Sequence, residues 1–100
     1  MISITFTNRG NRLSLRLEGH AGYAEHGKDI VCASVSILAY TLASFVNEVE
    51  NSTVDLTSAD TTIECATTDE TVVNAYLYAK RGYELLAFNY PQYVRLNTLT

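Results

Sequence analysis

The chain has 100 residues, of which 47% are hydrophobic and 18% are charged, and its formal net charge is −4 at pH 7. This length suits one compact domain, and the composition is typical of a folded protein, which excludes a disordered chain. Its seven Lys and Arg residues are scattered, which argues against direct nucleic-acid binding, because such binding depends on clustered cations.

The two cysteines, Cys32 and Cys65, are too few for a disulfide framework and lack metal-ligand spacing, so we expect no metal and no organic cofactor. No stretch resembling a signal peptide opens the sequence, and we therefore expect a cytoplasmic protein with reduced thiols. Residues 30–47 carry no formal charge but include several Ser and Thr side chains. They predict a helix buried on most of its surface, with no membrane contact.

The first two elements read as a β-hairpin. Apolar and polar residues alternate from Ile2 to Thr7 and again from Arg12 to Glu18, across the turn-forming residues 8–11. His20 lies just beyond the second strand and shares the parity of its polar face. Three of the five glycines follow in the connection to the next element: Gly19, Gly22 and Gly27. We expect a substrate-gating loop here, and a plain flexible connector is the alternative.

A long helix follows, from Ile30 to about Glu48, with Asp29 as its N-cap and Cys32 as its third residue. One face for close packing is predicted to consist of Ala33, Ile37, Tyr40 and Ser44. The remaining apolar positions are Val31, Val35, Leu38, Leu42, Phe45, Val46 and Val49.

The second half repeats the pattern of two strands and a helix. Residues 53–57 and 61–67 predict short strands, and Asp69 or Thr68 is expected to cap a second helix that ends before Pro91. Gly82 weakens this helix by roughly 1 kcal/mol unless close packing requires it. Its expected buried residues are Val72, Val73, Tyr76, Leu77, Tyr83 and Leu86. Residues 92–97 predict a last strand, giving the order ββαββαβ and a single α+β domain over residues 1–100.

Cys32 and His20 are candidates for a catalytic pair. A thiolate at a helix N-terminus is stabilised by unpaired N–H groups and by the helix dipole. An imidazole nearby can take the thiol proton and return it to a leaving amine. The ordinary alternative is a small buried cysteine, which is how we interpret Cys65 on its strand. His26 competes as the base, but its charged neighbours favour a solvated side chain, whereas His20 is anchored at a strand end.

Three further features support the candidate site. Asp29 is expected to cap and position the helix, or alternatively to orient protonated His20. Ser36 lies one turn after Cys32 and is expected to hydrogen-bond in the site or back to its own helix. Backbone N–H groups from Asp29 to Cys32 are candidates for stabilising an oxyanion, because a helix start presents unpaired donors.

Residues 19–36, GHAGYAEHGKDIVCASVS, resemble the signature of Prp, the ribosomal-processing cysteine proteases of bacteria. In that pattern a GH pair near the end of the second strand precedes D-x-V-C-A-x-x-S, and the resemblance extends to the late YPQYVRL segment. It implies a catalytic dyad of His20 and Cys32, with Asp29 and Ser36 at the matching supporting positions. His26 falls where the family loop varies.

The resemblance also implies a substrate and an assembly. Family members remove an N-terminal extension from a large-subunit ribosomal protein and form homodimers. Phage-encoded relatives exist, so a phage structural protein is an alternative substrate. The apolar surface of the uncharged helix independently predicts a homodimer. The alternative function is a non-catalytic, dimeric, ribosome- or capsid-associated binding module with the same fold.

Overall fold

A computed structural model describes residues 1–19, 22, 24, 29–49, 51–56, 60–67 and 69–99. The expected order ββαββαβ is confirmed, and most predicted boundaries hold within two residues. The elements are β1 (Ile2–Arg9), β2 (Arg12–Glu18), α1 (Ile30–Val46), β3 (Ser52–Leu56), β4 (Asp60–Ala66), α2 (Glu70–Asn89) and β5 (Val94–Leu99).

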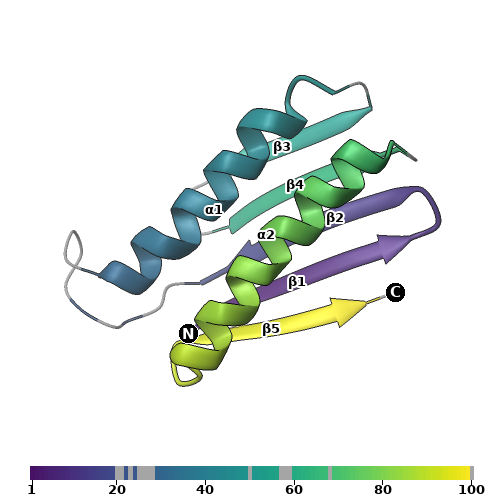
Figure 1. Ribbon diagram of the computed structural model, residues 1–100. Helices are drawn as coiled ribbons and strands as arrows, with labels where there is room; N and C mark the ends of the chain where they lie inside the picture. The colour runs from purple at the N-terminus through teal and green to yellow at the C-terminus, as the bar shows by residue number, and fades with distance from the viewer. Residues whose placement is uncertain are drawn as a thin grey trace.

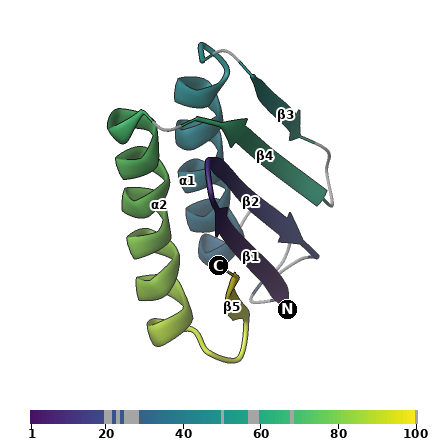
Figure 2. The ribbon, with the colours of Figure 1, turned by 90° about the vertical axis from the view of Figure 1, so that its right-hand side faces the viewer.

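The five strands form one sheet in the order β3-β4-β2-β1-β5. All neighbours are antiparallel except β1 and β5, which run parallel with Ile2 opposite Val94. Both helices lie on the same face of the sheet, with α1 over β3 and β4 and α2 toward β5 and β2 (Figures 1 and 2). The molecule therefore has two layers. The helix α1 begins at the end of the sheet where β2 ends (Figure 1).

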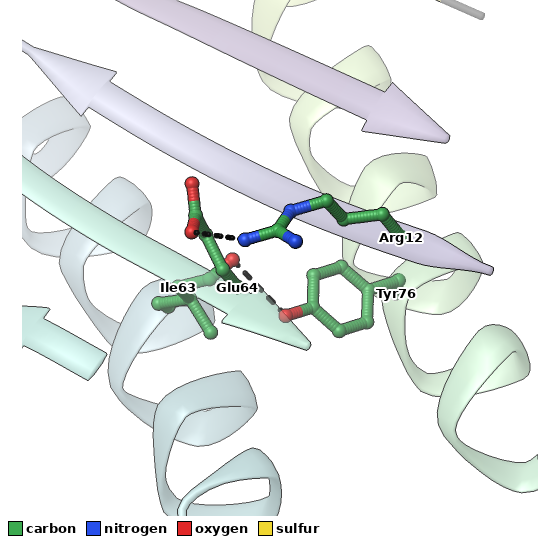
Figure 3. Close-up of polar contacts among 4 residues, drawn as sticks. All are labelled: Arg12, Ile63, Glu64 and Tyr76. Carbon is green, nitrogen blue, oxygen red and sulfur yellow. Dashed lines mark hydrogen bonds and ion pairs between the residues drawn. The ribbon is translucent and has the colours of Figure 1, made fainter. Parts of the chain in front are cut away.

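The core forms between the sheet and the helices from alternating strand residues. The apolar side chains of β1 and β2 are buried: Ile2, Ile4, Phe6, Leu13, Leu15 and Leu17. The buried side chains of α1 are Val31, Val35, Ala39, Leu42, Ala43 and Val46. The opposite parity of β1 and β2 carries Ser, Thr and charged residues, so the other face of these strands is polar. An example is the ion pair of Arg12 with Glu64, whose Nη2 and Oε2 atoms are 3.6 Å apart (Figure 3).

The structure corrects two packing predictions. Ala33, Ile37, Tyr40 and Ser44 are exposed in the single chain, because the core-facing side of α1 lies on the opposite part of the helix. The prediction that they form a close-packing face within the chain is therefore wrong. Leu77 of α2 was expected to be buried and is 40% exposed.

Two tyrosines fix α2 in place. The buried Tyr76 hydroxyl donates a hydrogen bond to the Ile63 carbonyl of β4 over 3.0 Å (Figure 3), and the Tyr83 hydroxyl donates to the Val35 carbonyl of α1 over 3.2 Å. Burial raises the pKa of both phenols, so both remain donors at neutral pH. Gly82, beside Tyr83, allows the helices to approach. A Cβ atom there would lie 2.7 Å from a Leu38 methyl carbon.

The last strand starts two residues later than predicted, because residues 91–93 form a turn in which the amides of Tyr93 and Val94 donate to the Tyr90 carbonyl. Neither helix in the described part of the chain has the length and apolar character that crossing a bilayer requires.

Candidate active site

The first turn of α1 is organised by Asp29, as predicted. Its Oδ1 atom accepts hydrogen bonds from the backbone amides of Val31 over 3.0 Å and Cys32 over 2.9 Å. Its own carbonyl accepts the first intrahelical bond, from the Ala33 amide over 3.0 Å. Asp29 has extended backbone angles, as an N-cap residue requires. The start of the helix, and with it the place of Cys32, is therefore set by this side chain.

The two thiols have different environments. Both cysteines are free. Cys65 is 1% exposed within the core, where burial raises the pKa of its thiol and favours the protonated, unreactive form. Cys32 is half-buried at the edge of the core, on the first turn of α1. The prediction that Cys65 is a core residue is confirmed, and Cys32 is the more accessible of the two thiols.

The hydrogen bonds of Asp29 correct the expectation for two of the four expected oxyanion donors. The amides of Val31 and Cys32 were candidate donors because a helix start leaves its first N–H groups unpaired. In the structure both already donate to the Asp29 carboxylate. They do not form an oxyanion site while this cap is intact.

Gly19 determines how the chain leaves β2. Its φ is +87°, a conformation that glycine adopts without strain. A Cβ atom at this position would lie 2.7 Å from the Met1 carbonyl oxygen, which is backbone and cannot turn aside as a side chain can. The glycine is therefore needed both for its conformation and for its lack of a side chain. This contact was missed in the sequence, because it arises only from the register of β1 with β2.

The remaining predicted residues are placed as follows. Ser36 is half-buried, one helical turn after Cys32. Gly22 has a φ of +68°, with open space where a Cβ atom would be. His20, His26 and Gly27 lie outside the described residues, so the dyad and the gating loop stay predictions. The structure thus brings Asp29, Cys32 and Ser36 together on α1, and it places Gly19 at the end of β2.

Comparisons with solved structures agree with this fold. The crystal structure of SMU.848 from Streptococcus mutans is 34% identical, with a TM-score of 0.79, covering 100% of this chain and 95% of the other. The ribosomal processing protease Prp from S. aureus, in complex with a covalently linked product peptide, is 21% identical, with a TM-score of 0.83. The match covers 98% of this chain and 99% of that chain. The same S. aureus protease in complex with a substrate peptide is 20% identical, with a TM-score of 0.73. The match covers 98% of this chain and 99% of that chain.

The family comparison extends along nearly the whole chain. No match was found among curated proteins. The model of the family described as cysteine protease Prp matches residues 1–95, which include β1 to β4, both helices and the first two residues of β5. The chain therefore belongs to the Prp family of cysteine proteases.

Proposed function

We propose that this chain is a cysteine endopeptidase in which Cys32 is the nucleophile and His20 is the general base. The observation that carries the proposal is the place of the Cys32 thiol, half-buried on the capped first turn of α1. This turn lies at the end of the sheet where β2 ends (Figure 1). Gly19 and then His20 directly follow β2 in the sequence. Membership of a cysteine protease family supports the same assignment.

The reaction proceeds in two halves. His20 takes the proton of the Cys32 thiol, and the thiolate sulfur attacks the scissile carbonyl carbon. The tetrahedral intermediate collapses to a thioester as the imidazolium gives its proton to the leaving amine. His20 then takes a proton from water, whose oxygen attacks the thioester and releases the new carboxyl end and the Cys32 thiol. Asp29 holds the start of α1, and Ser36 supplies a hydroxyl one turn from the sulfur.

The substrate is proposed to be a protein, either a large-subunit ribosomal protein with an N-terminal extension or a phage structural protein. The S. aureus protease, described as a ribosomal processing protease, supports this class of substrate because it was crystallised with a substrate peptide and with a product peptide. Processing of such a partner places the enzyme in the cytoplasm.

Mass spectrometry of each candidate partner, incubated with and without the enzyme, tests the proposal. The wild-type protein and the Cys65→Ala variant should both release one defined N-terminal fragment, and Cys32→Ala should release none. His20→Ala should slow cleavage by about 10² to 10⁴, the usual cost of losing a general base, and His26→Ala should change it little. Cleavage that persists in Cys32→Ala, or that is lost in a folded His26→Ala but kept in His20→Ala, would refute the assignment.

We also propose a homodimer, for which the outer surface of the two helices provides the support. An apolar cavity of about 340 Å³ lies between them, lined by Leu38, Thr41, Leu42, Phe45, Ala75, Tyr78 and Ala79. Tyr78 and Phe88, both on α2, are 85% and 83% exposed. Apolar exposure of this kind is typical of an interface. Sedimentation should show a dimer at micromolar concentration that Tyr78→Glu converts to a folded monomer, whereas a wild-type monomer would exclude the dimer.

A further inference from the structure

A second depression lies between α1 and the edge strand β3. It has a volume of about 400 Å³ and is lined by Tyr40, Ala43, Ser44, Asn47, Val54 and Leu56. We propose that this α1–β3 groove is a specificity site that binds an extended segment of the substrate, on one side of the scissile bond, with an apolar side chain in the groove and a Lys or Arg side chain beside Asp55. This inference rests on the proposed protease function.

The groove continues the helix face that carries the proposed nucleophile. At 3.6 residues per turn, Cys32, Ser36, Tyr40, Ala43 and Asn47 all project within about 80° of one another around α1. The first two belong to the candidate active site, and the last three line the groove. A chain that leaves Cys32 along this face of α1 therefore reaches the groove without crossing the helix.

The backbone of β3 is suited to binding an extended chain. β3 pairs with β4 on one side, and within the described residues no strand pairs with its other side. Such an edge presents N–H and C=O groups to which an added strand can bind. Two side chains of β3 face the groove, those of Val54 and Leu56, which share one strand parity. Val54 is half-buried and Leu56 is 45% exposed. An added strand would therefore place alternate side chains in the groove.

The charge distribution indicates which side chains alternate with the apolar ones. From residue 29 to residue 79 the sequence has eight Asp or Glu residues and no Lys or Arg. Since the whole chain has a net charge of −4, the other residues together carry +4. Asp55 lies between Val54 and Leu56 on β3, is exposed, and has the opposite parity. Oppositely charged side chains that face each other on two paired strands stabilise the pairing, so the substrate residue opposite Asp55 should be basic.

The geometry also gives the distance from the scissile bond. Tyr40 and Asn47 lie about 12 Å and 22 Å beyond Cys32 along the helix axis, at 1.5 Å per residue. An extended peptide advances about 3.3 Å per residue. The side chain in the groove should therefore belong to a substrate residue about four to seven positions from the cut, with basic residues directly next to it.

Profiling with a peptide library tests this prediction. The library is prepared from a proteome with an endopeptidase that cuts after Glu, which keeps Lys and Arg inside the peptides. The products of the wild-type enzyme are identified by mass spectrometry. They should show an enriched apolar residue, next to Lys or Arg, about four to seven positions from the cut and on one side of the scissile bond only. The double variant Tyr40→Ala/Leu56→Ala should reduce the apolar preference about tenfold, since it removes most of the apolar contact. Asp55→Lys should remove the preference for basic residues.

Two matched variants serve as controls. Leu99→Ala removes a side chain of nearly equal exposure, 46%, from the opposite edge strand β5, and Glu70→Lys reverses an exposed charge on the first turn of α2. Both should retain the wild-type profile. A wild-type profile in the groove variants, or the same change in the Leu99 control, would overturn the inference while leaving the protease function intact.

A binding measurement separates the groove from catalysis. ¹⁵N-labelled Cys32→Ala protein is titrated with a short Ser-rich peptide that contains one Leu flanked by two Lys, and with its Glu-flanked counterpart. The Lys peptide should shift the amides of residues 40–47 and 52–56 and bind at least about tenfold more tightly. Shifts confined to other residues would refute the groove, whatever the library shows. Groove shifts combined with no cleavage of the library or of any candidate partner by the wild-type protein would retain the groove as a peptide-binding site and refute the protease function.

Discussion

Asp29 has two possible roles, helix cap and catalytic carboxylate, and two substitutions distinguish them. Asp29→Ala removes the acceptor of the bonds from the Val31 and Cys32 amides, at 3.0 and 2.9 Å. Loss of an N-cap costs about 1 kcal/mol, within a range of about 0.5–2. For a domain of this size, that corresponds to a fall in Tm of about 4–8 °C. Asp29→Asn keeps an oxygen acceptor and should change the free energy of unfolding by only a few tenths of a kcal/mol.

Cleavage rates and alkylation of Cys32 complete the assay. If Asp29 acts as a cap, Asp29→Asn should cleave within a fewfold of the wild-type rate, and it should alkylate at the wild-type rate or faster, because a carboxylate repels a thiolate. Asp69 provides the control, since it caps α2 through a 2.9 Å bond from the Thr71 amide. Asp69→Ala should lower Tm and leave Cys32 reactivity unchanged. A large loss of cleavage in a fully stable Asp29→Asn variant would refute a role confined to capping and would assign the carboxylate a part in catalysis.

Three further predictions follow from the described contacts. Iodoacetamide should modify the folded protein at Cys32. Cys65 should react only on unfolding, because it is 1% exposed and burial raises the pKa of its thiol. Modification of Cys65 in the folded protein, detected by peptide mass mapping, would contradict this. Gly19→Ala should lower the free energy of unfolding, measured by urea titration, by about 1–3 kcal/mol and should reduce cleavage. Gly10 is the control: its φ is +60°, but a Cβ atom there would meet no atom within 4 Å, so Gly10→Ala should destabilise the protein less and leave cleavage unchanged. Tyr83→Phe should lower stability by about 0.5–1.5 kcal/mol through loss of the hydrogen bond to α1, and an unchanged Tm would show that this bond contributes nothing.

The element order was predictable because each element carries a local signal. Alternation marks β1 and β2, and Asp29 and Asp69 mark the helix starts. The packing of α1 was less predictable, because this helix has no charged residue to indicate its solvent-facing side. Ile37 and Tyr40 were assigned to a packed face and are 61% and 55% exposed. Only the positions of the sheet and α2 determine which apolar side of such a helix is covered.

The candidate site was predictable where chemistry is local in sequence. The N-cap of Asp29, the helical position of Cys32 and the burial of Cys65 all agree with the structure. The contact of Gly19 with Met1 and the groove beside Leu56 depend on pairing between distant segments. The threonine-rich region that contains β3 gave no sequence signal for substrate binding, because its contribution arises from its place at the edge of the sheet.

The parallel pairing of β1 with β5 has a consequence for folding kinetics. It joins Ile2 to Val94, so β5 completes the sheet only when segments far apart in the chain meet. Contacts of such large sequence separation slow folding, because the entropy of closing the loop is lost before the contacts form. Until residues 94–99 are synthesised, β1 has an open edge that carries Ile2, Ile4 and Phe6. A nascent chain therefore cannot complete its sheet, and a truncation within β5 should turn β1 into an aggregation-prone edge.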